Sequence, residues 1–178
     1  MKSKGKNVIT IRKERPGDEA QIYEVNYRAF ERKQEAGVVD SLRKSCPEGV
    51  SLVAEEDGKL VGHILFTPTI IESEGRSIIG TGLAPMAVLP EHQRKGIGSA
   101  LVRAGLEAMR KAGEPFVIVV GHPGFYPKFG FERASKYGIR CEYKEVPDEA
   151  FMIVVYDEEK IKGINGVAKE RPEFAAAI

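Results

Sequence analysis

Tryptophan is absent from the 178-residue sequence, and cysteine and histidine are scarce. The two cysteines, Cys46 and Cys141, lie far apart and do not form the Cys-x-x-Cys spacing of a zinc or thioredoxin-type site. The three histidines, His63, His92 and His122, are equally scattered, and none has a second histidine or a cysteine at metal-ligand spacing. We therefore expect no bound metal.

Long apolar runs and an excess of one charge are absent as well. No apolar run approaches the ~20 residues that span a bilayer, and no signal-peptide pattern opens the chain. The 27 basic and 26 acidic side chains give a formal charge of +1, which provides no electrostatic reason for nucleic-acid or membrane binding. The basic start, MKSKGK, is typical of a solvated tail. We expect a cytoplasmic protein that binds neither nucleic acid nor membrane.

The composition is that of an ordinary globular protein, with 42% hydrophobic and 30% charged residues. No internal repeat and no long Pro/Gly/Ser-rich linker divides the chain. A length of 178 residues suits one domain with a substantial core. We expect a single domain over residues 1–178, with its core at about 9–156 and a peripheral C-terminal segment at 157–178.

Hydrophobic periodicity and turn residues predict a mixture of strands and helices. The clearest hairpin spans residues 49–72, because Asp57 and Gly58 can supply the two positive φ values of a type I′ turn. Pro68 confines the second strand of this hairpin to a sheet edge or a bulge. The next strand, at 77–90, contains two glycines and Pro85 and should be bulged. Further strands are expected at 8–14, 116–120, 138–146 and 150–157, and helices at 18–30, 38–46 and 98–112.

A glycine-rich segment, LPEHQRKGIGSALV, leads into the last of these helices. Such an entry leaves several backbone N–H groups without intrahelical partners at the positive end of the helix dipole, which suits an anionic ligand. No Walker motif is present, and a dinucleotide fingerprint would require a small residue where Leu101 stands. The remaining phosphate-binding pattern, Q/R-x-x-G-x-G/A, is matched by Gln93, Gly96 and Gly98.

Together with a strand–helix–strand frame and with Tyr126, Gly130 and Phe131 downstream, this loop resembles that of the GNAT superfamily of acetyl-CoA-dependent N-acyltransferases. The resemblance extends from about Ile9 to Tyr156, and its most specific parts are APMAVLPEHQRKGIGSALV and FYPKFGF. It implies an α/β (α+β) fold with a central mixed, mainly antiparallel sheet of about seven strands, a splayed parallel strand pair and about four flanking helices. It also implies N-acetyltransferase activity.

The resemblance implies acetyl-CoA as cosubstrate, with the pantetheine arm in the gap between the splayed strands. Backbone amides from Arg94 to Ser99 would bind the pyrophosphate. The Val88 N–H would polarise the thioester carbonyl, and Tyr126 would donate a proton to the departing thiolate, since a phenol with a reference pKa of ~10 is protonated at neutral pH. The expected cosubstrate-binding residues are Met86, Ala87, Val88, Gln93, Arg94, Lys95, Gly96, Ile97, Gly98, Ser99, Phe125, Tyr126 and Phe129.

The group that takes the proton of the amine is not selected by any spacing in the sequence. His122, at the end of the strand at 116–120, is either this base or a residue that shapes the pocket, and the carboxylates that remain as candidates are Glu35, Asp40, Glu72 and Glu74. Many family members carry an asparagine where Val119 stands, so the pantetheine contacts of that residue are not expected here. The segment GHPGFYPKFGF resembles a bacterial subgroup with a G-x-P-x-[FY]-Y-x-x-F-G-F motif, whose substrates are poorly defined.

Two other functions are compatible with the loop. A catalytically silent acyl-CoA-binding sensor or partner-binding module would retain the loop without turnover, and a nucleotide-binding protein would prefer ATP or NAD to acetyl-CoA. The favoured interpretation is the enzyme, with a primary amine of a small molecule or a protein as the unidentified acceptor. The sequence leaves a homodimer open.

Overall fold

The computed structural model describes residues 8–176, so the basic MKSKGK start lies outside the described residues. Its strands form one nine-stranded sheet with the order β1-β2-β3-β4-β5-β8-β6, while β9 pairs with both β3 and β7. The strands are β1 (Ile9–Lys13), β2 (Val50–Glu56), β3 (Lys59–Ser73), β4 (Arg76–Val88), β5 (Phe116–Val120), β6 (Glu132–Arg133), β7 (Ile139–Cys141), β8 (Phe151–Val155) and β9 (Gly166–Lys169). The α-helices are α1 (Glu19–Phe30), α2 (Lys33–Ser45), α3 (Ile97–Lys111) and α4 (Glu158–Ile161).

The predicted hairpin of β2 and β3 is confirmed, and so is its turn. Asp57 and Gly58 have φ values of 50° and 76°, in the left-handed region that a type I′ turn requires. Pro68 lies where β3 has a partner on one side only, because the β2 register ends at Phe66 and the β9 register begins at Ile70. The proline, which has no N–H to donate, therefore occupies a locally exposed edge of an otherwise central strand.

The strand at 77–90 is bulged as predicted. Along β3 and β4 the pairing passes from Ile64 with Met86 to Phe66 with Leu83, so Ala84 and Pro85 together oppose one residue of β3. Upstream of this bulge β4 runs parallel to β5, and the register of the two strands ends at the pair formed by Leu83 and Val119. Beyond the bulge β4 continues to Val88 without β5 beside it.

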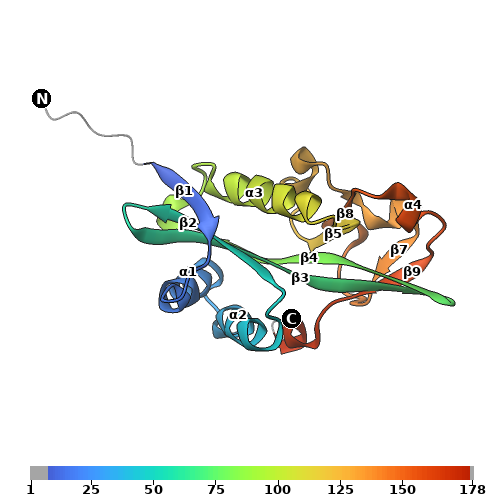
Figure 1. The fold of residues 1–178 in the computed structure, drawn as a ribbon, viewed down its shortest axis with the longest axis horizontal. Helices are drawn as coiled ribbons and strands as arrows, with labels where there is room; N and C mark the ends of the chain where they lie inside the picture. Colours follow the sequence, from blue (N-terminus) through green and yellow to red (C-terminus); the bar gives the residue numbers. More distant parts are fainter. Residues whose placement is uncertain (1–7, 177–178) are drawn as a thin grey trace, which may run out of the picture.

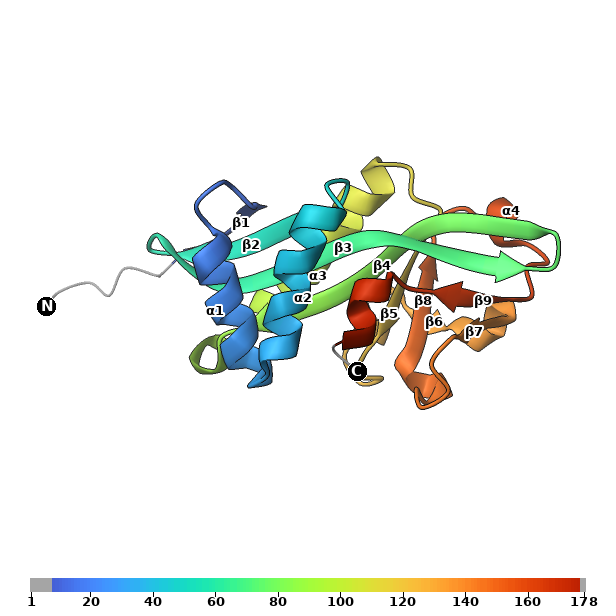
Figure 2. The ribbon, with the colours of Figure 1, turned by 90° about the horizontal axis from the view of Figure 1, so that it is seen from below.

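The helices cover both faces of the sheet. Helices α1 and α2 lie side by side on one face, and α3 lies on the other (Figures 1 and 2). Helix α3 approaches β3 closely at Gly62, where an added Cβ would lie 2.9 Å from Leu101 Cδ1 and 3.2 Å from Ile97 Cγ2. Leu101 on the helix and Gly62 on the strand therefore fit together. This packing explains why leucine stands at the position where a dinucleotide fingerprint requires a small residue.

Two predicted elements have different bounds in the structure. Helix α2 begins at Lys33 rather than near residue 38. Gly37, in the second turn of this helix, is an unfavourable helix residue that hides the start in the sequence. The strand predicted at 138–146 is only β7 (Ile139–Cys141), because its partner β9 pairs with three residues alone.

The C-terminal segment contributes more to the fold than a peripheral segment would. Strand β9 pairs with Ile70–Ser73 of β3, and it raises the number of strands above the expected seven. The side chains of Ile161, Ile164 and Phe174 are buried. A short 3₁₀ helix, η5 (Pro172–Ala176), lies beside α2 (Figure 2). The core therefore extends beyond Tyr156.

Candidate active site

The central feature of the site is the end of β4 where β5 has diverged. The Leu89 N–H donates to the Val61 carbonyl at 2.9 Å, so in an antiparallel ladder the next pair, Gly62 with Val88, is not hydrogen-bonded across the two strands. The N–H and C=O of Val88 consequently point away from β3, toward the side that β5 has left. The same alternation turns the N–H of Met86 to that side.

The loop after β4 is held to the strand by one of its own side chains. Gln93 donates from Nε2 to the Val88 carbonyl at 3.0 Å, which places the loop against the diverged edge of β4. Arg94 and Gly96 have φ values of 59° and 83°, and the left-handed glycine is the residue immediately before α3. The backbone thus reverses within three residues and aims the start of α3 at the gap.

The first turn of α3 presents backbone donors. The first intrahelical bond at this end runs from the Ala100 N–H to the Gly96 carbonyl, so the N–H groups of Ile97, Gly98 and Ser99 precede the helical ladder. No acidic residue lies in this turn. Arg94 and Lys95 are exposed beside it. Donors, dipole and cations together favour an anion.

Two adjoining cavities open along this edge. The loop cavity, of 550 Å³, is lined by the loop, the end of β4 and the end of α1, and includes Met86, Ala87, Val88, Gln93, Arg94, Gly96, Gly98, Ser99, Phe125 and Lys128. The strand-end cavity, of 930 Å³, shares Phe30, Met86, Gln93, Arg94 and Phe125 with it and continues past the bulge to Tyr126 and His122. Most of the residues expected at the site are therefore brought together.

Tyr126 is buried at the wall of the strand-end cavity, at the start of the 3₁₀ helix η2 (Tyr126–Phe129). Its ring packs edge-on against Phe125 and Phe131, with centroids 5.0 and 5.5 Å away. An added Cβ at Gly121 would lie 2.2 Å from Tyr126 Cε2, so this glycine is required for the ring position. Burial raises the pKa of Tyr126 to about 12, which keeps the phenol protonated.

The histidines differ in what their nitrogens do. His122 lines the strand-end cavity, but its Nδ1 accepts from the Gly124 N–H at 3.0 Å. A neutral ring with this bond carries its proton on Nε2 and has no lone pair left for a substrate. His92, in the loop cavity, pairs through Nε2 with Glu56 at 2.9 Å.

Phe129 and Val119 lie apart from both cavities. Phe129 lines a separate cavity of 350 Å³ together with Arg103 and Lys128, whose charged groups lie 5.2 Å from its ring. Lys128 lines the loop cavity as well, so the two cavities adjoin at this residue. Val119, which stands where many relatives carry asparagine, is 1% exposed and belongs to the hydrophobic core.

Three lining residues of the strand-end cavity come from distant parts of the chain: Phe30 at the end of α1, Glu35 in the first turn of α2, and Phe174 in η5. Glu35 was one of several candidates for the base in the sequence, whereas nothing there singled out Phe30 or Phe174. Only the tertiary fold brings these segments to the bulge in β4.

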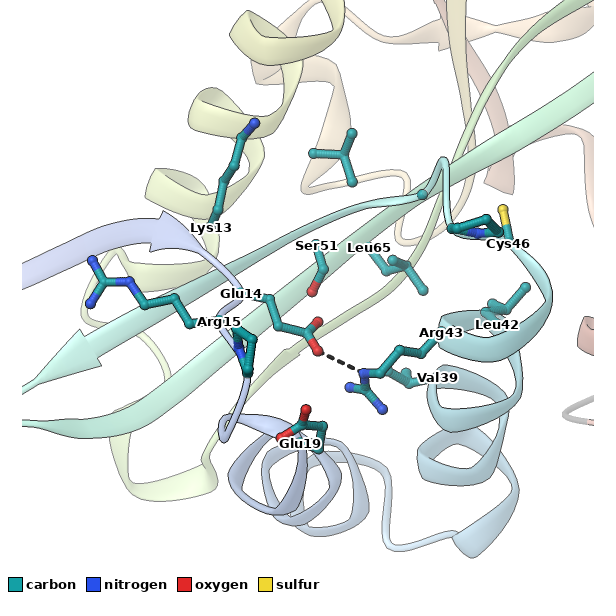
Figure 3. Close-up of a pocket in the computed structure, with 14 residues that line it drawn as sticks. Lys13, Glu14, Arg15, Glu19, Val39, Leu42, Arg43, Cys46, Ser51 and Leu65 are labelled. Atoms are coloured by element: carbon teal, nitrogen blue, oxygen red, sulfur yellow. Dashed lines mark hydrogen bonds and ion pairs between the residues drawn. The ribbon is translucent and has the colours of Figure 1, made fainter.

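A further cavity, of 380 Å³, lies on the face covered by α1 and α2 and shares no lining residue with the other two (Figure 3). Glu14 and Arg43 point toward each other in it, with Nε and Oε1 2.6 Å apart. Ser51 also lines it, and the Ser51 hydroxyl lies 3.0 Å from Nε2 of the buried His63.

Residues 8–176 contain neither a candidate membrane-spanning helix nor a candidate metal site. No helix there has the length and apolar character to cross a bilayer. No group of three or more histidine, cysteine, aspartate or glutamate side chains is arranged there to hold a metal ion.

Comparison with known sequences identifies the family. The model of an acetyltransferase (GNAT) domain matches residues 10–134. The uncharacterized N-acetyltransferase YjhQ of Escherichia coli is 44% identical over 135 residues, which cover 74% of this chain and 74% of YjhQ. The uncharacterized N-acetyltransferase YhbS of the same organism is 30% identical over 167 residues, which cover 93% of this chain and 98% of YhbS.

Solved structures agree with these matches. The crystal structure of YhbS in complex with CoA has a TM-score of 0.87 and 28% identity, covering 98% of this chain and 96% of that one. A GNAT acetyltransferase from Brucella melitensis in complex with acetyl-CoA has a TM-score of 0.76 and 34% identity, covering 94% and 99%. The resemblance and the fold class inferred from the sequence are confirmed, and the chain belongs to the GNAT family of N-acetyltransferases.

Proposed function

We propose that this protein is an acetyl-CoA-dependent N-acetyltransferase that moves an acetyl group from the CoA thioester to a primary amine by direct attack. The observation that carries the proposal is the diverged edge of β4, where a backbone N–H faces a cavity that runs from a helix N-terminus to a buried tyrosine. Relatives of similar length bind CoA or acetyl-CoA.

The residues present fit a pyrophosphate and its pantetheine arm. The amides of Ile97, Gly98 and Ser99 can donate to phosphate oxygens, and Gly98 leaves the space above the turn open, because an added Cβ there meets Met86 only at 3.4 Å. The edge of β4 from Met86 to Val88 can pair with an extended amide chain as an added strand would. The cavity that adjoins the loop cavity at Lys128 is also lined by Phe129 and Arg103, and this set of an aromatic ring and two cations suits the adenosine end with its extra phosphate.

The Val88 N–H is the donor that we assign to the thioester carbonyl. Since it is part of the β4 backbone, its direction is fixed before substrate binds, and a fixed donor stabilises a developing oxyanion without reorganisation. Gln93 contributes by holding the carbonyl of the same residue at 3.0 Å. This bond positions the donor and does not touch the reacting atoms.

Tyr126 is the group that we assign to protonate the departing thiolate. Its raised pKa, about 12, means that the hydroxyl is protonated across the pH range of ordinary assays. The phenol can therefore donate a proton to the thiolate at any pH in that range. In this assignment His122 shapes the pocket, because its Nδ1 already accepts from Gly124.

The proposal is tested by measuring CoA thiol release with a panel of amines, alongside calorimetry with acetyl-CoA. We expect acetyl-CoA to bind and at least one amine to release thiol, and we expect Tyr126→Phe to lower kcat by roughly 10²-fold at unchanged acetyl-CoA affinity. Binding without release on any amine would favour a silent acyl-CoA-binding module. Preferential binding of ATP or NAD would refute the acetyltransferase assignment.

A further inference from the structure

The strand-end cavity carries one carboxylate in its wall, and this charge favours a cationic acceptor. Glu35 is the only carboxylate among the described residues that line it. Its Oε2 is buried and makes no hydrogen bond with the described residues, while its Oε1 lies 3.5 Å from Nη1 of the exposed Arg32. A buried carboxylate oxygen without a hydrogen-bond donor is costly. The Glu35 side chain as a whole is 16% exposed and lines the cavity, so a turn of its carboxyl group toward a substrate cation would supply the donor that Oε2 lacks.

The rest of the wall is mainly apolar. Phe30, Val38 and Phe174 face the cavity from three elements of the α1–α2 side, and it is also lined by Leu83, Ala84, Pro85, Val120 and Phe125. The polar groups besides Glu35 are Gln93 and Arg94 of the loop, His122 and Tyr126. Arg94 also lines the loop cavity, and Gln93 is bonded to Val88, so both belong to the cosubstrate side.

The segment that carries Phe174 is fixed rather than loosely attached. Arg171 pairs with Glu173 at 2.9 Å and donates to the Ser45 carbonyl at the end of α2, while the Ser45 hydroxyl donates to Glu173. Phe174 packs in a cluster with Val38 of α2 and Leu65 of β3. The wall of the cavity at Phe174 is therefore preformed, and Phe174, unlike Phe30 and Val38, lies outside residues 10–134 that the family model matches.

We propose that the strand-end cavity binds a primary amine carried on an apolar group without a carboxylate, and that Glu35 binds the ammonium and accepts one of its protons. This inference rests on the proposed acetyl transfer. The apolar group of the acceptor lies against Phe30, Val38 and Phe174. A volume of 930 Å³ lies in the range of small-molecule pockets, so an acceptor of phenylethyl size is accommodated beside the thioester.

The proton balance of the step closes with these two residues. Glu35 takes one proton from the ammonium, and the neutral amine then forms the N–C bond to the thioester carbonyl carbon. The C–S bond breaks, the sulfur takes a proton from Tyr126, and Tyr126 regains one from the acylated nitrogen. The products are an amide and a thiol, and Glu35 releases one proton to solvent.

The test compares three amines that differ by one feature each. We expect kcat/KM for 2-phenylethylamine to exceed that for ethylamine by at least about tenfold, because only the former fills the apolar wall. It should also exceed that for phenylalanine, which adds a carboxylate to the same skeleton. A preference for phenylalanine, or equal rates for 2-phenylethylamine and ethylamine, would overturn the proposal.

Two variants connect these preferences to named residues. Glu35→Gln should lower kcat/KM for 2-phenylethylamine by roughly 10²-fold at unchanged acetyl-CoA affinity, whereas Glu24→Gln, at a carboxylate that is 59% exposed on α1, should leave it unchanged. Phe174→Ala should lower kcat/KM for 2-phenylethylamine by a larger factor than kcat/KM for ethylamine, because only the former contacts this ring. Full activity of Glu35→Gln would contradict the assignment.

Calorimetry separates this inference from the proposed transfer. If no amine releases thiol, the transfer proposal fails, and binding of 2-phenylethylamine to the CoA-saturated protein still tests the cavity. Binding that Glu35→Gln weakens at least tenfold would support the amine site without turnover. Absence of that binding, or binding that the variant leaves unchanged, would refute the site.

Discussion

Replacing Glu170 with glutamine should uncover a pH dependence of stability that originates in the buried His63. Asn26 donates from Nδ2 to the Ile22 carbonyl at 2.9 Å, and the same nitrogen lies 3.0 Å from His63 Nδ1. Since an amide NH₂ can only donate, Nδ1 accepts, and the ring proton is on Nε2, where it is donated to the Ser51 hydroxyl. The serine is therefore a hydrogen-bond acceptor and not a nucleophile activated by the histidine.

This network opposes a second proton on the ring. Complete burial, and then the positive charge of Arg43, lower the pKa of His63 from 6.5 to about 3. The unfolded chain binds a proton near pH 6.5 and the folded chain does not, so the stability that the neutral ring contributes is complete above pH 6.5 and is lost as the pH falls toward 3. The slope is about 1.4 kcal/mol per pH unit, so about 2.7 kcal/mol is lost by pH 4.5.

Glu170 has the opposite effect over nearly the same range. Burial, and then the negative charge of Glu142, raise the pKa of Glu170 from 4.5 to about 7. The folded chain therefore binds the proton first, and stability rises by up to about 3 kcal/mol as the pH falls from 7 to 4.5. The two contributions nearly cancel, and we expect the free energy of unfolding of the natural protein to be almost flat between pH 6.5 and 4.5.

Urea unfolding at pH 8, 6.5, 5.5 and 4.5 tests this balance. Glu170→Gln should be more stable than the natural protein at pH 8 and should lose about 2.7 kcal/mol by pH 4.5, while the double variant with His63→Gln should again be flat. A flat profile for Glu170→Gln alone would refute the neutral buried histidine. The His63 ring signal in NMR provides a check without substitution, because it should not titrate in the folded protein above pH 4.5.

Three glycines and one carboxylate give the remaining predictions. Gly98→Ala should leave the free energy of unfolding unchanged or raise it by up to about 1 kcal/mol. The same variant should weaken acetyl-CoA binding at least tenfold by calorimetry, because the added methyl group stands at the mouth of the loop. Equal affinity would argue against the anion site. Gly121→Ala should lower kcat by displacing the Tyr126 ring. The control Gly105→Ala, whose added Cβ would lie 2.2 Å from Phe66, should lower the free energy of unfolding by about 1–3 kcal/mol and retain kcat. Equal losses of kcat in the two variants would contradict the role of Tyr126. Arg171 and Ser45 lower the pKa of Glu173 to about 2, so the stability contributed by this carboxylate should be complete above pH 4.5 and lost below it, and Glu173→Gln should flatten the acid limb of urea unfolding.

The proposed cosubstrate half of the site could be inferred from the sequence because it is local. Gln93, Gly96 and Gly98 lie within six residues, and Gly96 adopts a positive φ immediately before the first residue of α3. The bulge was predictable for the same reason, since Pro85 and two glycines lie within one strand. Backbone-based sites of this kind leave a contiguous pattern in the sequence.

The proposed acceptor half could not be predicted in the same way. Its residues Phe30, Glu35 and Phe174 come from α1, α2 and η5, and no periodicity relates their positions. The sequence offered Glu35 only as one of several candidate carboxylates. The C-terminal segment was expected to be peripheral, and its ending RPEFAAAI has no strong hydrophobic period, yet the ring of Phe174 is buried against α2. Burial of a single side chain from a short 3₁₀ helix produces no signal that a pattern search can detect.

The specificity for the acetyl donor and the specificity for the amine acceptor are expected to change independently. The proposed donor site depends on backbone N–H groups, which most substitutions leave in place, so it should tolerate variation in the side chains around it. The proposed acceptor site depends on side chains, and those from α2 and η5 are held by contacts with each other. Under these proposed roles, a substitution at Phe174 or Glu35 should alter which amine is bound while acetyl-CoA binding is retained, and relatives that share the loop need not share an acceptor.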